Sequence, residues 1–254
     1  MGQTYLFLIS SAINHFRENE FSRFSEHDRF LQTIETIDSI RKKVENVYIC
    51  LFELSNTSLK KEYVDEFKSK IDLYLDFHDD KDIRQLYANF NIHPELFKYG
   101  KSLLELRGLG YCLDFIYKND YFEDTTRVFK ITGRYLLNDN FDIQDYNSKF
   151  LSDKYIIKHY NYNEYDSQDS VHYNVYQNKG SVVTALWSFD YGLLTTTMSM
   201  IEKSFFYLQK MLLYTPGNDI EHAIYNFIDK SKIINCEELG VTVRKGMDFD
   251  DYNE

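Results

Sequence analysis

Residues 127–142, with the sequence RVFKITGRYLLNDNFD, combine the pattern of a β-strand with residue types that bind anions. Polar and apolar residues alternate over 127–137, which predicts a strand. Lys130, Gly133 and Arg134 interrupt this alternation. A guanidinium presents a planar fork of donors that matches phosphate oxygens, and a glycine lets backbone and ligand approach closely. The stretch therefore predicts an anion site at the end of a strand.

Two carboxylates, Asp139 and Asp142, follow this strand. They are candidate ligands for a divalent metal ion, but they would equally suit the capping of the next turn. For Arg134, the alternative to anion binding is an internal ion pair with a carboxylate such as Glu105. We favour an anion site formed by fixed cations, with a metal site at the two aspartates as the alternative.

The composition is that of a soluble globular protein of 254 residues with a formal net charge of −11. Hydrophobic residues make up 43% and charged residues 27% of the chain, which supports a buried core and excludes wholesale disorder. A chain this acidic does not bind a phosphate backbone through its overall charge. Nucleic acid is therefore disfavoured as a partner unless a local groove concentrates Lys and Arg.

The cysteines and the start of the chain indicate a cytoplasmic protein. Cys50, Cys112 and Cys236 are widely separated, which indicates neither a disulfide framework nor a zinc site. The apolar run after Met1 is too short for a membrane span and lacks the preceding basic residues of a signal peptide. We therefore expect no membrane span, and the sequence leaves the oligomeric state open.

Strands and helices are predicted to alternate along the first part of the chain. In the first helix, Ser25 is the predicted N-cap and Asp28 occupies the capping-box position. Strands are predicted over 4–10, 44–54, 71–78, 127–137, 154–159 and 181–189, and helices over 25–43, 58–70, 81–89, 94–118, 191–213 and 219–230.

This order predicts an α/β fold in which a mainly parallel sheet is flanked by helices, within a single domain over 1–254. Ligands of such sheets bind at the carboxyl ends of the strands. The first predicted strand is followed there by Ser10, Ser11 and Asn14, and the second ends in Glu53. These polar side chains are therefore candidates for the same site.

Several common catalytic motifs are absent from the sequence. It has no glycine-rich dinucleotide fingerprint, no phosphate-binding G-x-x-x-x-G-K-[ST] loop, no G-x-S-x-G elbow and no H-E-x-x-H helix. The segment YGKS at 99–102 has only the end of the phosphate-binding motif. Lys101 could still bind an anion near a helix start, and a solvated lysine is the alternative. These motifs therefore give no support to a hydrolase or a zinc enzyme.

The order of elements and the segment KITGRY at 130–135 resemble the GT-A glycosyltransferases of the viral and bacterial polysaccharide type. In these enzymes a K-I-[ST]-G-R-Y strand stands in place of the Asp-x-Asp metal motif. The resemblance implies a GT-A-like, Rossmann-like fold, with residues 1–143 binding the nucleotide sugar and 144–254 on the acceptor side. Further similar segments are LISSAIN (8–14), RFLQTIETIDSIRKK (29–43), GKSLLE (100–105), IEHAIYNFI (220–228) and LGVTVRKG (239–246).

The resemblance also implies which residues bind the donor. Small polar side chains would meet the base or the ribose, Glu53 a ribose hydroxyl, and the cations the diphosphate. No tightly bound cofactor is expected, although Mn²⁺ or Mg²⁺ at the two aspartates remains an alternative. The donor-binding candidates are Ser10, Ser11, Asn14, Arg17, Glu53, Lys101, Lys130, Gly133 and Arg134, and the metal candidates are Asp139 and Asp142.

Transfer with inversion needs a base that removes the proton of the acceptor hydroxyl. Glu221, in the first turn of a late helix, is the candidate because the resemblance places an acid there. Its structural alternative is a glutamate favoured by the helix dipole. His222 and Asp190 are the second and third candidates, and Arg134 would stabilise the charge of the leaving diphosphate.

The implied function is the transfer of a sugar from a nucleotide-sugar donor to a glycan or other hydroxyl acceptor in polysaccharide biosynthesis. The expected location is the cytoplasm, or the host cytoplasm if the protein is viral. One alternative is a glycosyltransferase acting on modified bases of phage DNA, against which the net charge of −11 counts. The other is an inactive carbohydrate-binding relative, because the usual metal motif is missing.

Overall fold

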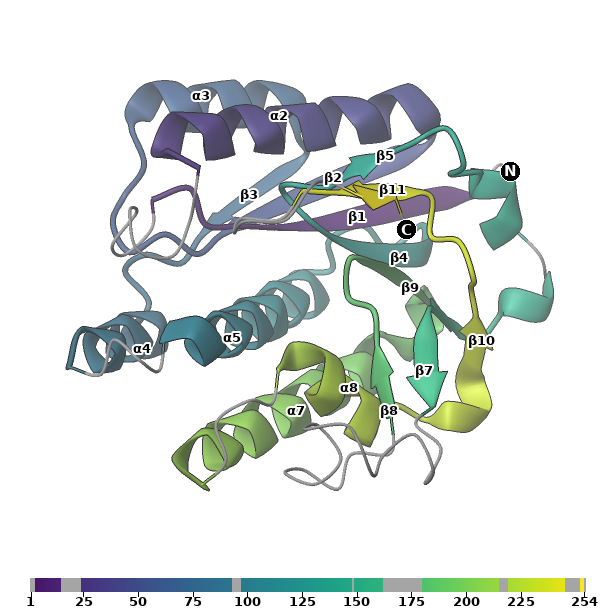
Figure 1. Ribbon diagram of the computed structural model, residues 1–254. Helices are drawn as coiled ribbons and strands as arrows, with labels where there is room; N and C mark the ends of the chain where they lie inside the picture. The colour runs from purple at the N-terminus through teal and green to yellow at the C-terminus, as the bar shows by residue number, and fades with distance from the viewer. Residues whose placement is uncertain are drawn as a thin grey trace.

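The computed structural model describes residues 3–14, 24–92, 97–147, 149–161, 180–214, 219–244 and 252–253. A seven-stranded sheet crosses the middle of the molecule in the order β10-β6-β9-β4-β1-β2-β3 (Figure 1). Its strands are β1 (Thr4–Ser11), β2 (Val47–Glu53), β3 (Leu73–Asp76), β4 (Thr125–Thr132), β6 (Tyr155–Ile157), β9 (Leu186–Asp190) and β10 (Ile233–Asn235).

Most neighbouring strands of this sheet are parallel. β1 runs parallel to both β2 and β4, β2 runs parallel to β3, and β10 runs parallel to β6. β9 is antiparallel to its two neighbours, β4 and β6. The predicted α/β fold with a mainly parallel sheet is therefore confirmed, and the carboxyl ends of β1, β2 and β4 lie at one edge.

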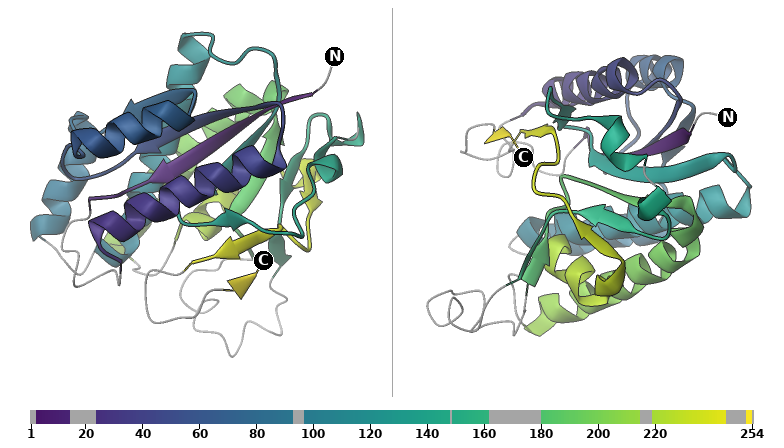
Figure 2. Two further views of the ribbon diagram at one scale, coloured as in Figure 1. Left: turned by 90° about the horizontal axis from the view of Figure 1, so that it is seen from above. Right: turned by 90° about the vertical axis from the view of Figure 1, so that its right-hand side faces the viewer.

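Helices cover both faces of the sheet, as Figures 1 and 2 show. One face carries α2 and α3, and the other carries α4, α5, α7 and α8. These helices are α2 (Glu26–Lys43), α3 (Lys61–Lys70), α4 (Lys81–Ile92), α5 (Phe97–Lys118), α7 (Leu194–Tyr214) and α8 (Ile220–Phe227).

The alternation of side chains along β1 explains why both faces must be covered. Tyr5, Phe7 and Ile9 belong to the hydrophobic core that includes residues of α2 and α3. Leu6 and Leu8 belong to a second core, with residues of α4, α5, α7 and α8. Successive side chains of a strand point to opposite faces, and each buried side chain contributes about 1.5–3 kcal/mol. The continuous apolar run of β1 thus specifies a two-sided sheet.

The first helix begins where its capping residues predict. The hydroxyl of Ser25 accepts from the amide of Asp28 at 3.2 Å, and the Asp28 carboxylate accepts from the amide of Ser25 at 3.0 Å. This capping box satisfies amides that the first helical turn leaves unpaired. It fixes the start of α2, and so places Arg29 and Thr33 on its first turns.

The predicted strand over 127–137 is divided in two by a tight turn. β4 ends at Thr132, because the amides of Arg134 and Tyr135 both donate to the Thr132 carbonyl, at 2.8 and 3.0 Å. The chain leaves the large sheet there, and the short strand β5 (Leu136–Leu137) pairs with β11 (Val241–Val243) in a second sheet. The turn therefore places Arg134 beyond the carboxyl end of β4.

Later elements are also shorter than predicted. The region 154–159 contains the whole of β6 and the start of β7 (His159–Asn161), and 181–189 contains parts of β8 (Gly180–Val182) and β9. β7 and β8 pair with each other outside the large sheet. The predicted helix over 219–230 ends at Phe227. Within the described residues, no helix is both long and apolar enough to cross a bilayer.

Candidate active site

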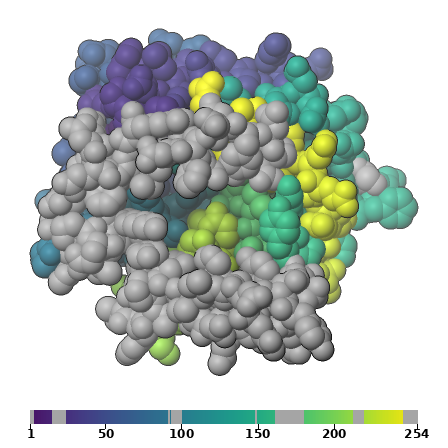
Figure 3. Space-filling model, viewed as in Figure 1, coloured from purple at the N-terminus to yellow at the C-terminus, as the bar shows by residue number. Residues whose placement is uncertain are grey.

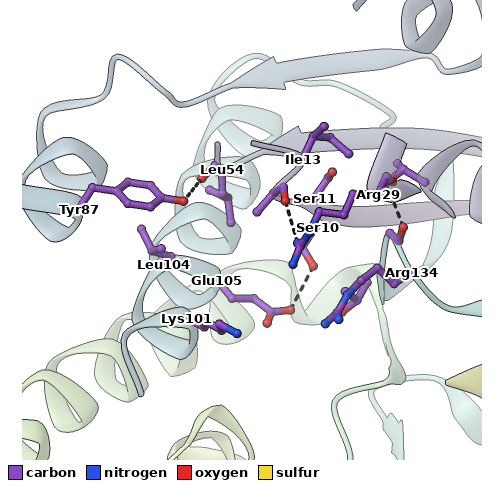
Figure 4. A pocket seen from close by; sticks show the side chains of 14 residues that line it. Ser10, Ser11, Ile13, Arg29, Leu54, Tyr87, Lys101, Leu104, Glu105 and Arg134 are labelled. Atoms are coloured by element: carbon purple, nitrogen blue, oxygen red, sulfur yellow. Dashed lines mark hydrogen bonds between the residues drawn. The ribbon is translucent and has the colours of Figure 1, made fainter. Parts of the chain in front are cut away.

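A pocket lies at the carboxyl ends of β1 and β4, between α2 and α5 (Figure 4). This is the edge at which parallel α/β sheets bind ligands. One part of its wall is apolar, and another carries the polar and charged side chains. The lining residues are Ser10, Ser11, Ala12, Ile13, Arg29, Thr33, Leu54, Tyr87, Lys101, Leu104, Glu105, Thr132, Gly133 and Arg134.

Five of the residues predicted to bind a ligand therefore meet in one pocket. Ser10 and Ser11 come from the end of β1, Gly133 and Arg134 from the turn after β4, and Lys101 from the second turn of α5. They lie far apart in the sequence, and the order of the sheet brings them together because β1 and β4 are neighbours.

Gly133 is required for the packing of its turn against α2. Its amide donates to the Ser10 carbonyl at 2.8 Å, and its carbonyl accepts from the Thr33 hydroxyl at 2.9 Å. A Cβ on Gly133 would lie 2.9 Å from Thr33 Oγ1 and 3.3 Å from the Ser10 oxygen. The turn at Gly133 therefore packs closely against α2 and β1, and the predicted approach of a ligand to this glycine stays a prediction.

Among the described residues, three cationic side chains line the pocket: Arg29, Lys101 and Arg134. In Figure 4, Lys101 and Arg134 reach the pocket from its two sides. Burial and, to a lesser extent, the positive charges of Arg134 and Arg29 lower the pKa of Lys101 to about 8. Like charges held this close favour an anion among them.

Arg29 was not predicted from the sequence. It is buried on the first turn of α2, and its Nη1 donates to the Ala12 carbonyl at 3.0 Å. Its position in the sequence could have indicated it. Arg29 follows the capping box of Ser25, and the helix after the first strand of such a sheet begins at the ligand-binding edge.

Lys130, predicted to bind the donor, lies in the core beside the pocket. Its side chain is 1% exposed, forms an ion pair with Glu105, and donates to Thr132 Oγ1 at 3.2 Å. Burial lowers the pKa of Lys130 to about 7. Within the described residues, Glu105 pairs with Lys130 and not with Arg134, so the predicted alternative for Arg134 is not found.

Glu53, predicted to meet a ribose hydroxyl, points into the protein. It is fully buried and accepts from the amide of Ile13 at 3.0 Å and from the amide and hydroxyl of Ser55 at 3.0 and 2.6 Å. Burial raises the pKa of Glu53. The carboxylate therefore holds the loop that follows β1, and it does not belong to the described pocket lining.

Asn14 and Arg17 are the remaining donor-binding candidates. The amide of Asn14 donates to Ser55 Oγ at 2.7 Å, and its side chain donates to Thr57 Oγ1 at 2.6 Å. Asn14 thus ties the first loop to the loop after β2, outside the described lining of the pocket. Arg17 lies outside the described residues.

Glu221 lies in the first turn of α8 and is partly buried there. Its Oε1 accepts from Thr184 Oγ1 at 2.5 Å. Burial and, to a lesser extent, the charge of Asp219 raise the pKa of Glu221 to about 7, against the lowering effect of Lys130. A carboxyl group with this pKa has the basicity of a general base at neutral pH. Figure 3 shows this face of the molecule hollowed at its centre, with yellow-green atoms of the α8 region at the floor.

His222, the second candidate base, is bound to its neighbour in the helix cap. Its Nδ1 lies 2.5 Å from the Asp219 carboxylate, which also accepts from the His222 amide at 3.1 Å. Burial lowers the pKa of His222, but the bond to Asp219 outweighs it and the net shift is upward. The histidine therefore favours its protonated form more than a free imidazole does.

Asp190, the third candidate base, lies at the opposite edge of the sheet. Because β9 is antiparallel to β4, Asp190 is paired with Arg127 near the start of β4. The pocket begins at Thr132, five residues along β4 and roughly 16 Å away at the rise of a strand. Asp190 instead caps a short helix by accepting from the Gly192 amide at 2.9 Å. Asp190 therefore lies away from the described lining of the pocket.

Asp139 and Asp142 do not form a metal site beside the pocket. Asp139 is fully exposed and pairs with Lys43 at 3.3 Å. Asp142 accepts from the Gln144 amide at 2.8 Å and caps a short helix, as the alternative reading predicted. In the part of the chain that the structure describes, no three His, Cys, Asp or Glu side chains are grouped as metal ligands.

Comparison with known proteins places the fold among glycosyltransferases. No family model and no curated protein sequence matches the chain. The structure is similar to that of the mannosyltransferase Ktr4p from S. cerevisiae in complex with GDP, with a TM-score of 0.50 and 11% identity over 91% of this chain and 68% of that chain.

A second similar structure is core-mannan synthase A from Aspergillus fumigatus in its Mn/GDP form, with a TM-score of 0.50 and 8% identity over 98% of this chain and 80% of that chain. The chain has a GT-A-like glycosyltransferase fold. At these identities the likeness concerns the fold alone. Within this GT-A-like fold, the cationic pocket stands at the carboxyl ends of β1 and β4.

Proposed function

We propose that this protein is a nucleotide-sugar-dependent glycosyltransferase that moves a sugar onto a hydroxyl group of a glycan. The observation that carries the proposal is the convergence of Arg29, Lys101 and Arg134 on one pocket at the carboxyl ends of β1 and β4. A sugar diphosphate needs such cations, and the fold is that of glycosyltransferases whose structures hold GDP. The apolar wall formed by Leu54 and Leu104 suits the nucleoside.

The pocket also supports the proposed division of labour between the two parts of the chain. All the described lining residues fall between Ser10 and Arg134, which favours residues 1–143 as the part that binds the donor. Residues 144–254 supply α8 with Glu221 and are proposed to bind the acceptor.

In the proposed reaction the acceptor oxygen attacks the anomeric carbon of the donor sugar from the face opposite the leaving group. The new carbon–oxygen bond forms as the bond to the diphosphate oxygen breaks, and the diphosphate leaves with that electron pair. Arg134 and Lys101 are assigned to stabilise the charge that develops there. Glu221 is assigned to receive the proton of the acceptor hydroxyl, for which its raised pKa suits it.

The test is a thermal-shift panel of UDP-, GDP-, CMP- and dTDP-sugars, followed by mass spectrometry of the reaction products. A donor that binds only the folded chain raises its apparent stability, by about 2.7 kcal/mol at a hundredfold excess over Kd. We expect one nucleotide to stabilise the protein and its sugar to be transferred or slowly hydrolysed. A chain that no nucleotide sugar stabilises would instead be a binding protein or an inactive relative.

A further inference from the structure

Thr184 lies between β8 and β9, at the edge of the large sheet that holds the pocket. β9 is antiparallel to β4, and its first residue, Leu186, is the register partner of Ile131. Ile131 directly precedes Thr132, which lines the pocket. The start of β9 is therefore at the carboxyl end of β4, and Thr184, just before it, is buried at the same edge.

A hydrogen bond joins Thr184 to the candidate base. Thr184 Oγ1 donates to Glu221 Oε1 at 2.5 Å, a length within the range of a hydroxyl bound to a carboxylate. An ionised carboxylate only accepts hydrogen bonds, so the threonine hydroxyl is the donor. Because Glu221 lies in the first turn of α8, the bond fixes the direction of its carboxylate relative to the edge of the sheet.

The start of α8 does not depend on this bond. Asp219 is the N-cap, and its carboxylate accepts from the amide of His222 at 3.1 Å. That cap satisfies an amide that the first helical turn leaves unpaired. The hydroxyl of Thr184 is bonded instead to the side chain of Glu221, so it acts on the carboxylate itself.

The same hydroxyl affects the charge of Glu221. Burial and the negative charge of Asp219 raise the pKa of Glu221. The hydrogen bond from Thr184 and the positive charge of Lys130 on β4 lower it. His222, which is bonded to Asp219, also interacts electrostatically with this carboxyl group. Because a donor to a carboxylate favours the ionised form, Thr184 keeps a larger fraction of Glu221 ionised at neutral pH.

We propose that Thr184 is a positioning residue whose hydroxyl holds the Glu221 carboxylate, at the pocket edge, in the orientation and ionised form that accept a proton. The inference rests on the proposed function, because Thr184 serves the role of Glu221 as the base. During transfer the proton of the acceptor hydroxyl goes to the Glu221 carboxylate, and Thr184 keeps its own proton. Thr184 therefore acts through Glu221 and not on the reacting atoms.

The first measurement is the titration of Glu221, followed by NMR of the full chain labelled with ¹³C-glutamate. The Glu221 resonance is identified by its loss in Glu221→Gln. Thr184→Val keeps the shape of the side chain without the hydroxyl, and it should move the midpoint up by about one pH unit. Thr184→Ser keeps the hydroxyl and should titrate like the wild type. An unchanged midpoint in Thr184→Val would overturn the inference, as would a midpoint in Thr184→Ser as high as in Thr184→Val.

The second measurement is the rate of transfer from the donor that the thermal-shift panel finds. In Thr184→Val the rise of kcat/KM with pH should move up by the same interval, so that kcat/KM at pH 6 falls by about tenfold. Donor affinity should stay unchanged, and Thr184→Ser should restore the wild-type profile. A wild-type pH profile in Thr184→Val would reject the role of Thr184.

Thr197→Val on α7 is the matched control. Thr197 is also buried, and its hydroxyl is bonded to the Tyr155 hydroxyl at 3.2 Å. Tyr155 pairs with Phe189 near the end of β9, away from the pocket edge. Thr197→Val should leave the titration of Glu221 unchanged, and a midpoint that moves as far as in Thr184→Val would overturn the inference. If Thr184→Val does not fold, Thr184→Ala removes the same hydroxyl without adding a methyl group.

The two proposals can fail separately, because the NMR titration needs no substrate. A raised Glu221 midpoint in Thr184→Val, in a chain that turns over no nucleotide sugar, would reject the glycosyltransferase function and leave the hold of Thr184 on Glu221 in place. Sugar transfer with the same rate, pH profile and Glu221 midpoint in Thr184→Val as in the wild type would keep the function and reject the role of Thr184.

Discussion

Lys130 on β4 and Glu105 on α5 form an ion pair that connects the sheet to the helix lining the pocket. Lys130 is buried in the core, whereas Glu105 lines the pocket and is 23% exposed. Removing one charge of a buried pair leaves the other without compensation. The pair therefore orients the single carboxylate of the described pocket lining and couples its position to β4.

The first prediction concerns the stability that depends on this pair. Lys130→Met should lower the free energy of unfolding by on the order of 2 kcal/mol, less than the full penalty for a buried pair because Glu105 keeps contact with solvent. The double variant Lys130→Met/Glu105→Gln should lose less, since no unpaired charge remains. Urea unfolding of the wild type, of Lys130→Met and Glu105→Gln alone, and of the double variant measures these losses. A double variant that is less stable by the sum of the two single losses would show that the residues do not interact.

The second prediction concerns the turn that presents Arg134. Gly133→Ala should destabilise the protein by about 1–3 kcal/mol, because its Cβ would lie 2.9 Å from Thr33 Oγ1. Gly110→Ala is the control: that glycine lies inside α5, its Cβ would meet Ile201 Cγ2 at an ordinary 3.6 Å, and alanine favours a helix. Thermal unfolding should separate the two variants clearly. An unchanged melting temperature for Gly133→Ala would mean that α2 and the turn move apart at little cost.

The third prediction separates chemistry from donor binding. Glu221→Gln keeps the size of the side chain and its bond to Thr184 but removes the basic carboxylate. We expect donor affinity to be unchanged and kcat to fall by about 10²–10⁴-fold. The control Glu202→Gln, at an exposed site on α7, should leave kcat unaltered. Turnover of the Glu221 variant at the wild-type rate would remove this residue from the mechanism.

The fourth prediction is a bell-shaped dependence of kcat/KM on pH. Glu221 acts as a base only when deprotonated, and its pKa is raised to about 7, so activity should rise with pH through about 7. Lys101 binds the diphosphate only when protonated, and its pKa is lowered to about 8, so activity should fall above about 8. kcat/KM reports these groups in the free enzyme.

The alkaline limb can be assigned with a conservative variant. Lys101→Arg keeps a positive charge at every pH used, so the decline above pH 8 should disappear while the acid limb remains. A decline that persists in Lys101→Arg would show that another group titrates there.

Several features of this protein follow from the sequence alone, because they depend on local patterns. The continuous apolar run of β1 specified a strand that is buried on both faces, and the capping box of Ser25 and Asp28 specified the start of α2. The KITGR segment indicated a strand with Arg134 near its end, although the predicted strand continued to Leu137 and the turn after Thr132 was not predicted. Each signal depends on side-chain periodicity or on a contact within a few residues.

The composition of the site depends on contacts between distant residues, which only the tertiary structure decides. Arg29 joins the pocket because α2 packs on the turn at Gly133, and Lys130 is withdrawn from it because its side chain enters the core, where it pairs with Glu105. Glu53 turns inward to hold a loop, and the antiparallel direction of β9 carries Asp190 to the opposite edge. Residue type shows which chemistry a side chain can perform, but strand order and direction decide which side chains meet.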